Sequence, residues 1–130
     1  MWILDTNTLI YFFKGQGKVA ERLLDHQPAD IGLPAIVLFE LEVGISKSIS
    51  PTKRKAQLKE LSSVVELLEF GHAEAEAAAR VRVDLEKAGK PIGPYDTLIA
   101  GTAVAHDGIL VTRNTQEFKR VKNLKIENWY

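Results

Sequence analysis

The sequence contains no cysteine, which excludes a disulfide framework and any zinc site built from thiolates. No apolar run reaches the roughly 18 residues that a helix needs to span a bilayer. The chain opens directly on Met1-Trp2-Ile3-Leu4-Asp5, so we expect no secretory signal peptide. Repeats, linkers and low-complexity tracts are also missing. These absences predict a cytoplasmic protein with no membrane-spanning segment.

An excess of charge of one sign is missing as well. Lys and Arg number 17 and Asp and Glu number 17, so the formal net charge is zero. A nucleic-acid-binding protein often carries a basic excess, because its affinity rests on neutralising phosphates. A nuclease with an acidic metal site, however, carries acids that cancel several of its lysines and arginines. Net charge therefore neither favours nor excludes a nuclease.

The length and the hydrophobic content of the chain suit one compact domain. The chain has 130 residues, of which 45% are hydrophobic, and this is enough to build a core. Short apolar strands alternate with helical segments, a pattern typical of a parallel sheet covered by helices on both faces. We therefore predict a single domain, residues 1–130, with a three-layer α/β/α sandwich and a short, mostly parallel sheet.

The expected elements follow from apolar periodicity and from glycine and proline punctuation. Gly89 and Pro91 stop a long alanine-rich helix, and Pro34 stands at the start of another, where proline is tolerated. The predicted strands are 1–4, 30–33, 64–68, 109–111 and 124–127. The predicted helices are 8–13, 18–26, 34–47, 51–61, 72–90 and 95–106, with a helical turn at 117–120.

Polar residues follow the first predicted strand directly. Asp5 ends the strand and is followed by Thr6 and Asn7. Parallel sheets bind ligands beyond the carboxyl ends of their strands, so this cluster is a candidate site. Asp5 could instead cap the helix that follows, which is a frequent use of aspartate.

A second candidate acid lies in the predicted helix 34–47. Glu40 has Ile36, Val37, Val43 and Gly44 one turn away, and a carboxylate among apolar neighbours needs a partner or a metal. Glu42 is also flanked by apolar residues and points almost oppositely, roughly 200° around the helix. Periodicity alone does not choose between the two glutamates.

Two further segments carry polar residues where the predicted sheet would bring them together. Asp96 opens a helix rich in small residues that suit close packing, although it could also serve as a simple first-turn acid. After the strand at 109–111 come Thr112, Arg113, Asn114 and, three residues later, Glu117. Such loop residues are usually solvated turns, and alone they prove nothing.

Taken together, these segments resemble the VapC toxins within the PIN-domain family. The resemblance rests on Leu4-Asp5-Thr6-Asn7, Glu40-Leu41-x-x-Gly44, Asp96 with Leu98-Ile99-Ala100, and Leu110-Val111-Thr112-x-Asn114, in this order along nearly the whole chain. The segments 89–96 and 112–118 look most like the subgroup that cleaves initiator tRNA. The resemblance implies a magnesium-dependent endoribonuclease toxin, with Mn²⁺ able to substitute, and selects Glu40 over Glu42.

The resemblance also implies roles for individual residues. Asp5 and Asp96 would bind metal, and Glu40 would bind a second ion or orient the attacking water. Many PIN domains have an aspartate where this chain has Asn114, and Glu117 would supply the missing charge. The expected contacts to substrate phosphate or to the ligands are Thr6, Asn7, Thr112, Asn114 and Arg113. Other basic candidates for holding phosphate are Lys90, Lys119 and Arg120.

Two other functions fit the sequence less well than a nuclease. An aspartate-based phosphohydrolase would carry Asp-x-Asp after its first strand, but Asn7 occupies the second position and cannot act as a general acid. A catalytically silent binding module would lack one of the first three acids, and none is missing. The expected partners are a VapB-like antitoxin, a tRNA substrate and a second copy of the chain. The homodimer is expected because the helix at 35–45 is apolar nearly all round.

Overall fold

The computed structural model describes residues 1–130. Five strands form its sheet: β1 (Trp2–Leu4), β2 (Ile31–Pro34), β3 (Glu66–Leu68), β4 (Ile109–Val111) and β5 (Lys125–Glu127). The helices are α1 (Thr6–Lys14), α2 (Val19–Leu24), α3 (Ala35–Ser46), α4 (Pro51–Ser62), α5 (His72–Lys87), α6 (Pro94–Ala105) and α7 (Thr115–Phe118), with a 3-10 turn at Pro28–Asp30. No helix is long and apolar enough to cross a membrane.

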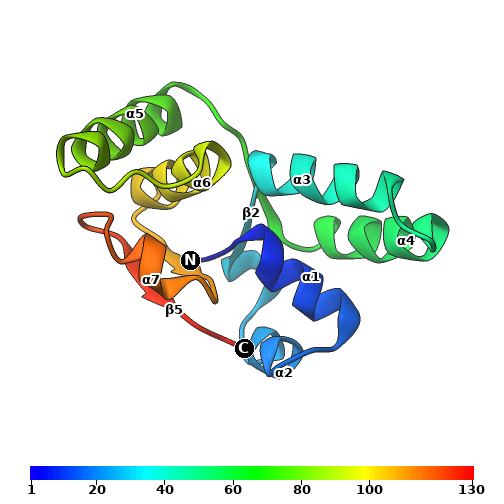
Figure 1. Cartoon of the computed structure of the whole chain (residues 1–130). Coiled ribbons are helices and arrows are strands. Elements are labelled where there is room, and N and C mark those ends of the chain that lie inside the picture. Colours follow the sequence, from blue (N-terminus) through cyan, green and yellow to red (C-terminus); the bar gives the residue numbers. More distant parts are fainter.

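The strand order is β3-β2-β1-β4-β5, and every pairing is parallel. The chain moves outward from β1 to β3 and then returns to the other side of β1. Right-handed crossovers therefore place α1 to α4 on one face and α5 to α7 on the other, as Figure 1 shows. The predicted three-layer α/β sandwich is confirmed, and its sheet is wholly parallel.

The central strands are strongly apolar because they lie in the core. Ile3, Leu4, Leu110 and Val111 are almost fully buried, because β1 and β4 lie inside the sheet and are covered on both faces. On one side the packing is closest between α5 and α6. A Cβ at Gly101 would lie 2.5 Å from Ala78, so only glycine allows these two helices to approach so closely.

Most predicted boundaries differ from the structure by one to three residues, and three of these differences have a clear cause in the backbone. Helix α5 ends at Lys87 rather than at residue 90, because Gly89, with φ +69°, turns the chain and lets the Lys90 amide donate to the Leu85 carbonyl. Helix α7 begins at Thr115, two residues before the predicted turn. Strand β3 begins only at Glu66, since the residues before it still donate backbone hydrogen bonds to the end of α4.

Candidate active site

The candidate acids meet at the carboxyl edge of the sheet. Asp5 follows β1, and the segment beginning at Thr112 follows the neighbouring strand β4. Helix α6 runs back to the start of β4, so its own first turn, with Asp96, lies at the same edge. Helix α3 contacts both α1 and α6 and brings Glu40 into the same region.

Asp5 is both a helix cap and a buried carboxylate. Its Oδ1 accepts a hydrogen bond of 2.9 Å from the backbone amide of Thr8, which fixes the start of α1. The Thr8 hydroxyl donates to the Val111 carbonyl at 3.0 Å, and this ties the helix to β4. Asp5 is only 6% exposed. The capping and ligand interpretations are thus compatible, because the cap holds the carboxylate in one orientation.

Burial raises the pKa of Asp5 above its ordinary range. The neighbouring polar groups, which are the Thr112 and Thr8 side chains and the Thr8 amide, lower this pKa, but they do not offset burial. The negative charge of Glu40 raises the pKa of Asp5 further. Asp5 therefore lacks a compensating positive charge.

Glu40 lies in the second turn of α3 and is half-buried. The Thr6 hydroxyl donates to its Oε1 at 2.7 Å, joining α1 to α3 beside Asp5. Glu42 is exposed on another side of the helix, and its side chain makes no hydrogen bond or ion pair in the structure. The structure thus brings Glu40 to Asp5 and leaves Glu42 in solvent.

Asp96 shows how strongly the acids interact. Its pKa is raised from the ordinary 3.8 to about 6, first by burial and then by the negative charges of Asp5, Glu117 and Glu40. A position in the first turn of a helix normally favours a carboxylate. Burial and three like charges outweigh that effect here, so the four acids form one electrostatic group.

The loop after β4 shows what Asn114 does at the position where many PIN domains have an aspartate. The Asn114 amide nitrogen Nδ2 donates to Glu117 Oε2 at 2.7 Å, and the Asn114 backbone amide donates to the Thr112 hydroxyl at 3.0 Å. Asn114 therefore orients Glu117 rather than adding a charge of its own. Glu117 in turn is one of the acids that raise the pKa of Asp96.

None of these four carboxylates has a cationic partner. The five ion pairs of the structure use Glu127, Glu76, Glu86, Glu74 and Asp107 instead. No three Asp, Glu or His side chains stand close enough to enclose an ion by themselves. The donor set, made only of hard oxygen atoms, nevertheless fits Mg²⁺, because this ion keeps several waters and needs only one or two direct carboxylates.

The other predicted residues divide into two groups. Thr6 and Thr112 hydrogen-bond to the acids, as described, and Asn7 is exposed on the first turn of α1. Arg113 does not point to the acids: its guanidinium lies 3.6 Å from the centroid of the Tyr130 ring. Thr8 was not predicted, although the spacing Asp5-x-x-Thr8 at a helix start is a recognisable capping pattern.

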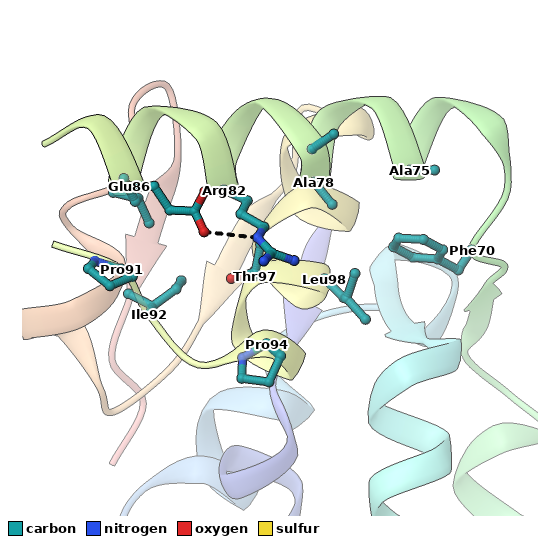
Figure 2. A pocket seen from close by; sticks show the side chains of 12 residues that line it. Phe70, Ala75, Ala78, Arg82, Glu86, Pro91, Ile92, Pro94, Thr97 and Leu98 are labelled. Carbon is teal, nitrogen blue, oxygen red and sulfur yellow. Dashed lines mark hydrogen bonds and ion pairs between the residues drawn. The ribbon is translucent and has the colours of Figure 1, made fainter. Parts of the chain in front are cut away.

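A cavity of about 580 Å³ lies apart from the four acids, between α5, α6 and the loop that joins them. Figure 2 shows Phe70, Ile92, Pro94 and Leu98 around it, with the Arg82–Glu86 ion pair of 3.1 Å on α5. Its lining is largely apolar and includes none of the four acids. The chemistry of the four acids therefore marks the candidate active site better than the size of this cavity.

Comparison with known proteins identifies the family of the chain. The PIN domain family model matches residues 2–124. The tRNA(fMet)-specific endonuclease VapC of Salmonella typhimurium is 32% identical over 98% of this chain and 97% of its own length. Ribonuclease VapC2 of Rickettsia felis is 34% identical over 99% of this chain and 98% of its own length.

Solved structures show the same likeness over the whole fold. The DNA-bound VapBC of Salmonella typhimurium superposes with a TM-score of 0.92 at 33% identity, covering 99% of this chain and 98% of that one. The VapBC2 complex of Rickettsia felis, bound to a DNA fragment from its promoter, gives a TM-score of 0.91 at 35% identity with the same coverage. The family model and these relatives show that the chain, with its parallel sheet and four clustered acids, belongs to the PIN-domain family, among the VapC proteins.

Proposed function

We propose that this chain is a metal-dependent endoribonuclease and the toxin of a VapBC toxin–antitoxin pair. Magnesium is the proposed metal, Mn²⁺ a substitute, and the anticodon region of initiator tRNA the proposed substrate. The observation that carries the proposal is the gathering of Asp5, Glu40, Asp96 and Glu117 without an ion pair to any of them, so that burial and, after it, the three neighbouring negative charges raise the pKa of Asp96. Such a group is built to receive a cation, and the relatives named as endonuclease and ribonuclease agree with RNA hydrolysis.

Asp5 and Asp96 are the proposed metal ligands, with Glu40 beside them. A bound divalent ion would lower the pKa of its water and neutralise charge on the transferring phosphoryl group. The role of the neighbouring side chains is to orient the acids. Thr8 and Thr112 hold Asp5, Thr6 holds Glu40, and Asn114 holds Glu117.

The direct test is cleavage of purified initiator tRNA with magnesium and with EDTA. Asp5→Asn and Asp96→Asn should each abolish cleavage, because both remove a charge from the metal site and keep the size of the side chain. Asp84→Asn, at an exposed position on α5, is the matched control and should cleave normally. Cleavage by either site variant at the wild-type rate, or equal cleavage in EDTA, would contradict the proposal. Phosphate release from small esters with intact RNA would favour a phosphohydrolase.

The proposed inhibitor is a VapB-like antitoxin, as in the complexes that the structural neighbours form. Arginine matches carboxylates bidentately, so an antitoxin tail that places an arginine among the four acids would occupy the metal site. We expect an adjacent small gene to encode this antitoxin, and its co-expression should relieve toxicity. Substitution of that arginine should weaken inhibition more than binding. If the chain expressed alone is harmless and no neighbouring product binds it, the toxin assignment fails.

A homodimer is proposed from the exposed apolar side of α3. Phe39 is 50% exposed and Val43 40% exposed, so the monomer does not cover this helix completely. Phe39 contacts Tyr95 of α6, with ring centroids 5.8 Å apart, and Tyr95 is itself 47% exposed. A second copy could cover this surface. Light scattering should show a species of twice 14.5 kDa at micromolar concentration, and a purely monomeric sample would refute it.

A further inference from the structure

Three side chains from distant parts of the chain form a stack beside the candidate active site. Tyr11 of α1 and Tyr130, the last residue of the sequence, meet edge to face with ring centroids 4.8 Å apart. The Arg113 guanidinium covers the Tyr130 ring at 3.6 Å from its centroid and lies 5.6 Å from that of Tyr11. We call these three residues the Arg-Tyr stack.

The Arg-Tyr stack adjoins the four acids through both of its supporting segments. Arg113 stands between Thr112, which hydrogen-bonds to Asp5, and Asn114, which holds Glu117. Tyr11 lies one helical turn beyond Asn7, which is exposed next to Asp5. Arg113 is thus the direct chain neighbour of two residues that contact the acids, and Tyr11 lies on the helix that Asp5 caps.

The Arg113 side chain in the stack also has N–H donors that no protein group accepts. No hydrogen bond or ion pair joins the Arg113 side chain to any other protein group, although arginine offers five N–H donors. Arg113 is exposed, and Tyr130 remains 41% exposed. The contact therefore neither buries the guanidinium nor pairs its charge. Here the aromatic ring holds a free guanidinium in one place.

The position of Tyr130 is itself defined by the backbone. Gly17 has a φ of +63°, and a Cβ there would lie 2.9 Å from the Cα and ring of Tyr130. The Lys18 amide donates to the Tyr130 carbonyl at 3.3 Å, and the Tyr130 amide donates to Asn128 Oδ1 at 3.0 Å. The last residues are thus docked against the loop between α1 and α2, and the ring is presented in a fixed orientation.

From these observations we infer that the Arg-Tyr stack is a nucleotide subsite that binds an unpaired base of the RNA next to the scissile phosphate. This inference rests on the proposed ribonuclease function and adds the residues that grip the substrate. Aromatic rings and guanidinium planes stack on bases of any sequence. The free N–H donors of Arg113 would contact the adjoining phosphate or base edge. Because Arg113, Tyr11 and Gly17 already contact the Tyr130 ring, the base stacks on the outer face of the guanidinium, which the ring holds in place.

The test measures binding of a fluorescein-labelled single-stranded RNA dodecamer by anisotropy, together with kcat and KM for tRNA cleavage. Tyr130→Leu keeps an apolar side chain on Gly17 but removes the ring, and it should raise Kd roughly ten-fold. Tyr130→Phe should restore binding to within about two-fold of wild type, because the guanidinium stacks on the ring and does not need the hydroxyl. The loss should fall on Kd and KM more than on kcat, since the stack does not touch the metal ligands.

Arg113→Lys separates recognition from folding. The residue is exposed, so the fold should be unaffected, and the charge is kept while the planar group is lost. We expect Kd to rise about five-fold, whereas Arg80→Lys at an exposed position on α5 should leave Kd unchanged. Wild-type Kd and KM for both Tyr130→Leu and Arg113→Lys would overturn the inference while leaving the ribonuclease proposal intact. Failure of the wild-type chain to bind or cleave RNA would overturn both.

Discussion

Asp96→Asn should stabilise the metal-free protein at neutral pH while abolishing its activity. The pKa of Asp96 is raised from 3.8 to about 6 by burial and by three neighbouring acids. At roughly 1.4 kcal/mol per pKa unit, keeping this group ionised costs about 3 kcal/mol in the fully buried limit. Asp96 is only half-buried and water screens it, so we expect a gain of about 1 to 2 kcal/mol from the neutral amide.

The pH dependence follows from the sign of the change. Because the folded pKa is raised, the folded state binds more protons than the unfolded state between pH 3.8 and about 6. Stability of the wild type should therefore fall as pH rises through this window, and the full cost should be present above it. The raised pKa of Asp5 acts in the same direction. Asparagine does not titrate, so the difference between variant and wild type should vanish near pH 4.

The assay is thermal unfolding by circular dichroism in EDTA, from pH 4 to pH 8. Each kcal/mol corresponds to roughly 3 to 5 °C for a chain of this size, so Asp96→Asn should melt about 5 °C higher than wild type at pH 7.5. Asp84→Asn, exposed on α5, should not change the melting temperature at any pH. A lower melting temperature for Asp96→Asn at pH 7.5, or a difference that is constant across the range, would refute the assignment of unpaired like charges.

Three further results are expected. Gly101→Ala should lower the free energy of unfolding by about 2 kcal/mol, because its Cβ would lie 2.5 Å from Ala78. Gly44→Ala should raise the free energy of unfolding by roughly 0.5 to 1 kcal/mol, because its Cβ would meet nothing within 4 Å. Equal effects of the two substitutions in denaturant titrations would contradict this packing. Glu40→Gln should reduce tRNA cleavage far more than Glu42→Gln, and equal losses would contradict the placement of the two side chains. Magnesium should raise the melting temperature of the wild type more than that of Asp96→Asn, and an equal rise would show that the ion binds elsewhere.

The fold could be predicted from the sequence because its signals are local. The strands β1 and β4 are short apolar runs that end in polar residues, and the helices are bounded by Gly89, Pro91 and similar breakers. The predicted boundaries failed where a hydrogen bond decides the element, as at Asn114 before α7 and at Leu85 near the end of α5. Such bonds depend on geometry that composition does not reveal.

The site was less visible in the sequence than the fold. Parallel topology predicts that residues after β1 and β4 lie close together, and the structure does bring Asp5 near Thr112. Periodicity left Glu40 and Glu42 equal, because the choice depends on a contact between α1 and α3. The Arg-Tyr stack had no local signal at all, since Tyr11 and Tyr130 come from opposite ends of the chain.

If the four acids act as proposed, inhibitor binding and metal binding would exclude one another. The same carboxylate oxygens can be neutralised by protons, by a divalent ion or by an arginine, and each of these removes the repulsion that raises the pKa of Asp96. Once one cation is bound, the electrostatic attraction for the next is smaller. An inhibitor that places an arginine among Asp5, Glu40 and Asp96 would therefore compete with metal rather than merely cover the substrate surface. Rising magnesium should therefore weaken binding of the proposed inhibitor, and acid pH should weaken binding of both the metal and the inhibitor.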